Sequence, residues 1–216
     1  MTKKEIFKRY ILFVISLFFI GLGIGFTKHG NMGISPVSSV ANVLSIRFEF
    51  MSFGTWLFIT NCLFLLGQIV LLRKKFQPIQ LLQIPLSMIF GYFSDFGVWI
   101  VSGLPNGVYA LRLLWVMCGI VVVGFGVSLS VIAEVILNSS EALIKAIADT
   151  FKKDFGNMKV LFDVSWVVVA TCLSLIFFHG LEGVREGTIL SAVCIGLVVK
   201  FIKPRITPGL TKLLKK

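Results

Sequence analysis

Long apolar runs constrain this chain more than any other feature of its sequence. Six runs approach or exceed roughly 18 residues, the length that a helix needs to cross a hydrocarbon core of about 30 Å. They lie at 10–27, 54–72, 79–101, 113–133, 160–178 and 188–202. Because a membrane core offers no water to backbone N–H and C=O groups, such runs fold as helices. The sequence therefore predicts an all-α, polytopic membrane protein with six transmembrane helices.

The composition agrees with this class. Hydrophobic residues make up 56% of the 216 positions and charged residues 14%, against about 25% charged in soluble domains. In a soluble chain the net charge of +11 would suggest a nucleic-acid partner. Here the basic residues gather on one side of the predicted membrane, where they meet anionic lipid. The expected partner is the lipid bilayer, and no nucleic acid.

The distribution of Lys and Arg predicts how the spans are oriented. With the N-terminus in the cytoplasm, most of the 21 basic residues fall in cytoplasmic segments. Those on the other side are Lys28, Arg47, Arg112 and Arg185. A bias of this strength places both chain ends in the cytoplasm. We expect a multi-pass protein of the inner (cell) membrane.

An internal repeat divides the spans into two sets of three. The stretches 21–40 and 124–143 share one pattern, in which spaced glycines end an apolar run and a short polar segment leads to another helix. At one constant separation, Arg9 matches Arg112, Gly21 matches Gly124, Gly23 matches Gly126, Asn31 matches Glu134, Pro36 matches Ser139 and Ser38 matches Glu141. Three spans in each copy mean that the second copy enters the membrane from the opposite side, so the repeats are inverted. We assign 1–105 to the first repeat, 106–203 to the second and 204–216 to a basic cytoplasmic tail.

A short helix is predicted between the first and second spans of each repeat, at 36–48 and at 139–153. In the first of these, Ser38 and Asn42 begin a polar stripe along one face. This helix either re-enters the membrane with its stripe toward a cavity or lies at the outer interface. In the second, Glu141 begins a charged stripe, which is typical of a helix at the cytoplasmic surface.

Polar residues inside the predicted spans are further candidates for function, because a carboxylate in a span costs about 2.5–3.5 kcal/mol on insertion scales. Asn61 and Asp163 fall at matching depths of the second and fifth spans. Asp163 either lines a path or pairs with Lys159, one turn earlier. Asp95 is the deepest carboxylate of the first repeat and a candidate for proton coupling. It belongs to a stripe on the third span formed by Gln80, Gln83, Ser87, Gly91 and Asp95.

The motifs of enzymes are missing from the sequence. It contains no HExxH, no GxSxG and no nucleotide-binding loop. The spaced glycines at 21–25 lie within a span, where they predict close helix packing rather than phosphate binding. The four cysteines lie inside apolar runs without CxxC spacing, as packing residues do. We therefore expect no enzymatic activity, no metal and no cofactor.

Several of these features together resemble the YczE/YyaS/YitT family of bacterial integral membrane proteins. The resemblance rests on Arg9 at the start of the first span, the glycine-spaced end of that span, Met-Gly-Ile-Ser-Pro at 32–36 and Ser-Phe-Gly at 52–54. After the proline, the family's turn carries an aromatic or basic residue and an acid, where this chain has Val37 and Ser38. The resemblance implies a six-span inner-membrane protein of a group often described as permeases, and it implies no substrate.

Three functions are compatible with the sequence. The leading hypothesis is a small secondary transporter for an unidentified small solute, with or without proton coupling. Its predicted path is lined by Ser38, Asn42, Asn61, Asp95, Glu141 and Asp163. The alternatives are a non-transporting membrane scaffold or accessory protein, and a substrate-binding membrane subunit of an ATP-driven importer. A polar cavity between the repeats would favour transport over the scaffold, and a homodimer is one expected assembly.

Overall fold

The computed structural model describes residues 2–215, and helices account for nearly all of them. Along the chain these are α1 (Lys3–His29), α2 (Pro36–Arg47), α3 (Phe53–Leu72), η1 (Arg73–Lys75), η2 (Pro78–Leu82), α4 (Gln83–Val101), α5 (Tyr109–Ala133), α6 (Ser139–Phe151), α7 (Phe155–Phe178) and α8 (Glu186–Lys215). The elements η1 and η2 are 3-10 helices. The predicted all-α class is confirmed.

Five segments of the described chain are long and apolar enough to cross a membrane. They are α1, α3 with η1, η2 with α4, α5 and α7. The sixth predicted span, 188–202, lies in the first half of α8. That helix continues through Pro204 and Pro208, so the predicted tail 204–216 is helical wherever the structure describes it.

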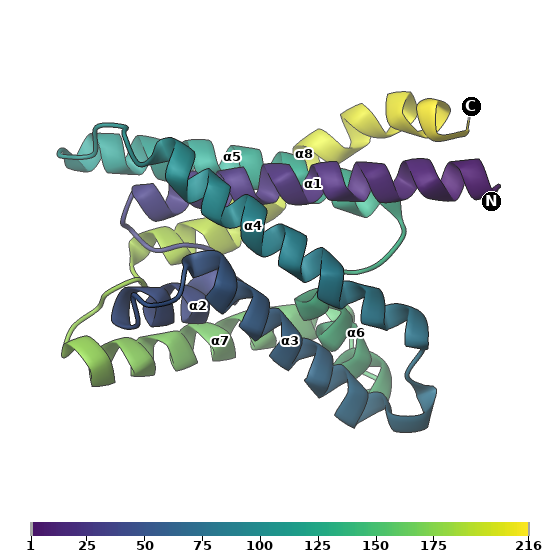
Figure 1. Cartoon of the computed structure of the whole chain (residues 1–216), viewed down its shortest axis with the longest axis horizontal. Helices are drawn as coiled ribbons and strands as arrows, with labels where there is room; N and C mark the ends of the chain where they lie inside the picture. The colour runs from purple at the N-terminus through teal and green to yellow at the C-terminus, as the bar shows by residue number, and fades with distance from the viewer. Residues whose placement is uncertain (1, 216) are drawn as a thin grey trace.

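Both chain ends lie at one end of the bundle, which we call the terminal face; the opposite end is the far face (Figure 1). Lys8 donates from Nζ to the backbone oxygen of Leu213 at 3.2 Å. Leu214 is buried among apolar side chains of α1 and its neighbours. The last turns of α8 thus pack on the first turns of α1.

The antiparallel helices α1 and α5 form the centre of the bundle, and glycines let them approach closely. A Cβ atom added at Gly23 would lie 2.7 Å from the backbone nitrogen of Val123. A Cβ atom added at Gly126 would lie 2.8 Å from the backbone nitrogen of Ile20. Gly23 matches Gly126 in the sequence repeat, and Ile20 matches Val123 at the same separation. The two helices therefore contact each other through matching positions.

The matching arginines each lie at the C-terminal end of the other central helix. The buried Arg9 donates from Nη1 to the backbone oxygen of Ala133, at the end of α5, at 3.0 Å. Arg112 acts through one intermediary: its Nε donates to the oxygen of Asn106 at 3.0 Å, and the Asn106 amide donates to the oxygen of His29, at the end of α1, at 2.6 Å. The last carbonyls of a helix lack partners within it and attract positive charge. This explains why an arginine opens each run.

The short helices α2 and α6 lie within the bundle, and each contacts both α3 and α7 (Figure 1). The two sit in opposite halves, α2 toward the far face and α6 toward the terminal face. The buried residues of α2 are Pro36, Ser38, Ser39, Val40, Ala41, Asn42 and Val43. Helix α6 is amphipathic, as its charged stripe indicates: Ala142, Ile144, Ala146 and Ala148 are buried, while Lys145 and Asp149 are exposed. Both short helices are thus integral parts of the helix packing.

Candidate functional site

A cavity of about 470 Å³ opens in the half of the bundle that carries the terminal face. Its walls come from the end of α3, the segment that includes η2, the start of α4, the loop after α5, and α6. The lining residues are Leu72, Lys75, Gln77, Ile79, Gln80, Gln83, Val135, Ile136, Leu137, Ala142, Lys145, Ala146, Asp149 and Thr150. Several polar and charged side chains thus converge on one opening, as they do in ligand sites.

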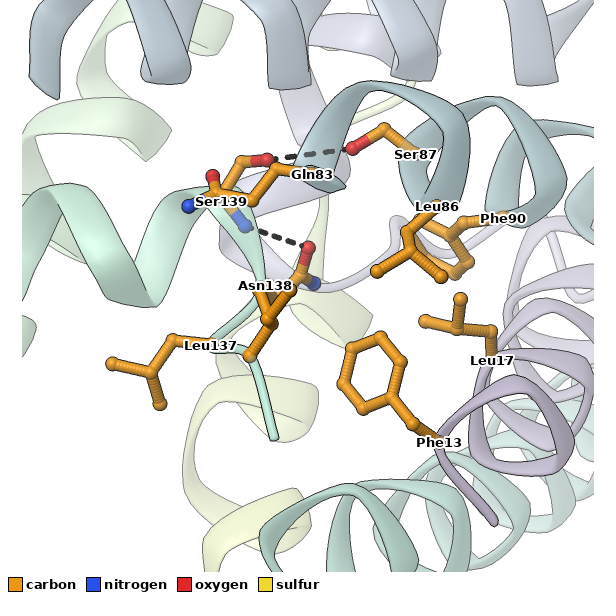
Figure 2. Close-up of a pocket in the computed structure, with 10 residues that line it drawn as sticks. Phe13, Leu17, Gln83, Leu86, Ser87, Phe90, Leu137, Asn138 and Ser139 are labelled. Atoms are coloured by element: carbon orange, nitrogen blue, oxygen red, sulfur yellow. Dashed lines mark hydrogen bonds between the residues drawn. The ribbon is translucent and has the colours of Figure 1, made fainter. Parts of the chain in front are cut away.

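A second, much smaller cavity of about 10 Å³ adjoins the first and shares Gln83 and Leu137 with it. Its volume is about that of one water molecule. Figure 2 shows its apolar side, formed by Phe13 and Leu17 of α1 together with Leu86 of α4. The smaller cavity therefore lies between α1 and the larger cavity's wall at Gln83 and Leu137.

Buried amides and hydroxyls surround the start of α6, where the two cavities meet. Gln68 of α3 and Gln83 of α4 exchange two amide hydrogen bonds, at 3.0 and 3.1 Å. Gln68 also donates to the backbone oxygen of Ser139 at 3.0 Å. The hydroxyls of Ser87 and Ser139 lie 3.3 Å apart and point toward each other (Figure 2). These four residues, which we call the Gln68 cluster, are all buried.

The wall formed by α6 carries charge of both signs. Lys145 and Asp149 are one helical turn apart, and both are exposed toward the cavity. Across the opening, the side-chain oxygen Oε1 of Gln80 is buried and has no hydrogen-bond partner within residues 2–215. A buried acceptor without a donor is costly. A rearrangement that brings a donor to the Gln80 oxygen is therefore favourable.

The structure places the predicted residue Asn42 in a different cluster, in the half that carries the far face. Lys28 of α1 donates from Nζ to Oδ1 of Asn42 at 2.7 Å and to the hydroxyl of Ser45 at 2.9 Å. The Asn42 amide in turn donates to the backbone oxygen of Gly183 at 2.9 Å. Ser38, on the same stripe, is buried, and its hydroxyl lies 3.2 Å from that of Ser35. The polar stripe of α2 therefore binds other parts of the protein.

Asp95 and Asn61 also have partners within the protein. Asp95 accepts a hydrogen bond from the backbone N–H of Gly54, in the first turn of α3, at 2.6 Å. A carboxylate is favourable there because N–H groups in the first turn lack partners within the helix. Asn61 is buried and donates to the oxygen of Leu57, one turn earlier, at 2.9 Å. These contacts give both side chains structural roles.

Glu141 and Asp163 lie near each other on α6 and α7. Asp163 pairs with Lys159 at 2.8 Å, which is the pairing that the sequence offered as the alternative to a path residue. Glu141 lies on α6, outside the five candidate spans. Burial raises the pKa of the Glu141 carboxyl; the Lys159 ammonium opposes this shift and the Asp163 carboxylate adds to it.

None of the six predicted path residues lines either of the two cavities. The residues that do line them include Gln80, Gln83 and Ser87, which stood out in the sequence as a stripe on the third predicted span. Lys145 belongs to the charged stripe predicted for the second short helix. The sequence thus carried a signal for these residues, but it did not indicate that the two stripes face each other.

Fold and site together define an all-helical membrane protein with an interior polar cluster reached from one face. The chain belongs to a family of unknown function, DUF6198, whose model matches residues 7–204. It is 27% identical over 207 residues to a protein named "Uncharacterized membrane protein YczE" from Bacillus subtilis (strain 168), an alignment that covers 94% of this chain and 89% of that protein. No solved structure matches the chain. The YczE-type family assignment that the sequence suggested is confirmed.

Proposed function

We propose that the protein is a small transporter built from two inverted three-span repeats, with 188–202 as its sixth span. The close contact of α1 with α5 through matching glycines supports the repeat. Asn31 and Glu134, another matching pair, also share a left-handed backbone with a φ of 50°. Contacts between matching positions are expected when a two-fold axis lies between two copies of one unit.

In this proposal the terminal face is the cytoplasmic side of a bacterial cell membrane. The argument is the distribution of Lys and Arg, because short cytoplasmic segments of membrane proteins are rich in both. The cavity then opens to the cytoplasm, and the structure corresponds to an inward-open state. A homodimer and proton coupling through Asp95 stay predictions.

The observation that carries the transport proposal is the route that the larger cavity offers from the half with the terminal face to Gln83 of the Gln68 cluster. A cavity of about 470 Å³ falls within the range of roughly 300–1,000 Å³ of small-molecule sites. Inverted-repeat transporters bind their solute where the repeats meet, at the ends of short or broken helices. Here Ser139 at the start of α6 occupies such a position. A scaffold or accessory protein has no use for such a route, so the cavity favours transport.

The chemistry of the walls favours a small dipolar solute. Lys145 attracts a carboxylate or another anionic group, and Asp149, one turn away, attracts a cationic group. Apolar side chains such as Ile136 and Leu137 line the same cavity and suit a short hydrocarbon portion of the solute.

A binding screen followed by a flux measurement tests the proposal. The purified protein is heated with a panel of amino acids, betaines, amines and organic acids, and ligands that raise its melting temperature are then tested for uptake into proteoliposomes. We expect Lys145→Gln and Asp149→Asn to remove both the shift and the flux. Lys153→Gln, an exposed charge change outside the cavity, should leave both unchanged.

A protein that is folded in liposomes but moves no member of the panel would overturn the transport proposal. Binding without flux would indicate a sensor or accessory protein. Co-purification of ATPase subunits would indicate the importer subunit.

A further inference from the structure

The two short helices are covered differently by the loops that face them. On the side of the far face, the loop before α8 lies directly on α2. Gly183 accepts the hydrogen bond from Asn42, and a Cβ atom at Gly183 would lie 3.3 Å from Cγ2 of Val43. Val184 is 6% exposed and packs in the same apolar cluster as Val43. This contact closes the far-face side of α2.

On the side of the terminal face, the corresponding segment stands away from α6. Here Gln77, Ile79 and Gln80, in the segment before α4, form one wall of the cavity, and Lys145 and Ala146 of α6 form the facing wall. Ile79 is 54% exposed, in contrast to the buried Val184. One side of the bundle is therefore closed by a loop on a short helix, while the other is open.

The residues on the two sides match at the constant separation of the sequence repeat. Asn42 matches Lys145 and Val43 matches Ala146 at that separation, and the loop that contains Gly183 precedes α8 as the segment that contains Gln80 precedes α4. Two copies of one unit that meet through matching positions can exchange their conformations, so that the closed copy opens while the open copy closes. The contact between α2 and the Gly183 loop then indicates the contact that the segment before α4 would make with α6 in the other conformation.

We infer that the far face carries a second solute entrance, between α2 and the Gly183 loop, which is closed in this structure. It opens in a second state, in which the segment from Gln77 to Gln80 closes onto α6. In that state Lys145 donates to Oε1 of Gln80, as Asn42 donates to Gly183 here. The inference rests on the proposed transport function and identifies the opposite entrance of its path.

Three features of the open side favour this closure. The unpartnered Gln80 oxygen gains a donor, which removes the cost of a buried unsatisfied acceptor. The exposed Ile79 loses contact with solvent when its segment packs on the wall formed by α6. Lys145 carries three donors and is exposed, so its ammonium group is free to reach across the opening.

Disulfide trapping tests the inference without knowledge of the solute. In a background with the four native cysteines replaced by serine, the pair Val43→Cys with Gly183→Cys reports the closed far face. The pair Ala146→Cys with Gln80→Cys reports the closed terminal face. We expect both pairs to cross-link on oxidation in membranes, the second more slowly because its state is not the one seen here. The uncross-linkable pair Ala146→Cys with Gln80→Ser controls for labelling.

Cross-linking then decides which face a reagent reaches. With the Ala146–Gln80 pair locked, a third cysteine at Val184, which leaves the Asn42–Gly183 hydrogen bond in place, should react at least tenfold faster with a membrane-impermeant maleimide added to the far face. With that pair reduced, the reaction should stay slow. Failure of the pair at 80 and 146 to cross-link, while the pair at 43 and 183 does so, overturns the inference. Cross-linking without a change in labelling at position 184 also overturns it.

A single substitution keeps the inference testable if a cysteine pair fails to fold. Asn42→Ala removes one buried hydrogen bond from the closed far face and should raise far-face labelling of a cysteine at Val184 by roughly fivefold. Ser45→Ala, which leaves the Asn42–Gly183 contact in place, is the matched control. Equal labelling in the two variants overturns the inference. Alternating labelling without solute flux would overturn the transport proposal and leave the second entrance intact.

Discussion

The close contact between α1 and α5 predicts that Gly23→Ala destabilises the protein. An added Cβ atom would lie 2.7 Å from the backbone nitrogen of Val123 and 2.8 Å from the backbone oxygen of Gly119. Both atoms belong to the backbone of a long helix and cannot rotate away as a side chain can. The two helices must therefore separate by several tenths of an ångström along much of their contact.

The expected magnitude follows from a comparison with a second glycine. Overpacking a tightly packed contact costs about 1–3 kcal/mol, whereas Ala gains about 0.5–1 kcal/mol over Gly in a helix interior. Gly196, in α8, has nothing within 4 Å of an added Cβ atom. The variant Gly196→Ala therefore has the gain in helix propensity without the steric clash between helices. We expect Gly23→Ala to be less stable than Gly196→Ala by about 2 kcal/mol, or roughly 30-fold in the unfolding equilibrium.

Unfolding in mixed micelles of dodecyl maltoside and sodium dodecyl sulfate, followed by circular dichroism, measures the difference. Gly126→Ala should behave like Gly23→Ala, because Ile20 and Ser16 backbone atoms lie 2.8 and 2.9 Å from its added Cβ atom. Equal midpoints for Gly23→Ala and Gly196→Ala would refute the reasoning. An effect of Gly23→Ala without a similar effect of Gly126→Ala would refute the matched packing of α1 and α5.

Three further predictions concern buried polar groups. Arg9→Met should lower the free energy of unfolding by about 2–3 kcal/mol, because carbonyls at the end of α5 lose a charged donor. As a control, Arg205→Met at an exposed position should have little effect in the same mixed-micelle unfolding measurement. Gln68→Leu or Gln83→Leu alone should each lower the free energy of unfolding by about 1–3 kcal/mol, because the partner amide is left unsatisfied. In a double-mutant cycle, the double variant should lose less stability than the sum of the two single losses. Strict additivity of the two losses would contradict the pairing. Because burial raises the pKa of Glu141, the folded protein binds more protons than the unfolded chain between the ordinary value of about 4.3 and the raised one. Stability from this group is then fully present below about pH 4 and falls as the pH rises through that window, so Glu141→Gln should flatten the measured fall, and an unchanged slope would contradict the burial.

Much of the fold followed from the order of apolar and polar residues. Five of the six predicted spans and both short helices were predictable because a helix in lipid must satisfy its own backbone hydrogen bonds. The glycines at 21–25 were correctly interpreted as packing positions: Gly21 contacts backbone atoms of α4 and Gly23 those of α5. The end of α8 was not predictable, because Pro204 and Pro208 indicate breaks, whereas Ile206, Leu210 and Leu214 pack against the apolar cluster that includes residues of α1.

The candidate site was predictable only as separate stripes. The sequence placed Gln80, Gln83 and Ser87 on one helical face and Lys145 on another, because side-chain direction repeats with the helical period. The sequence could not show that these two faces border one cavity. Nor could it show that Asn42, a predicted path residue, binds Lys28 instead.

There is a physical reason why some features were predictable from the sequence and others only from the structure. Class, span positions and helix faces depend on local hydrophobicity and on the period of a helix, and the sequence by itself determines both. Which polar group meets which depends on how helices distant in sequence approach and rotate against one another. The tertiary structure alone therefore decided that Asp95 binds the start of α3, that Asn42 binds Lys28, and that the open polar cavity lies beside α6 rather than α2.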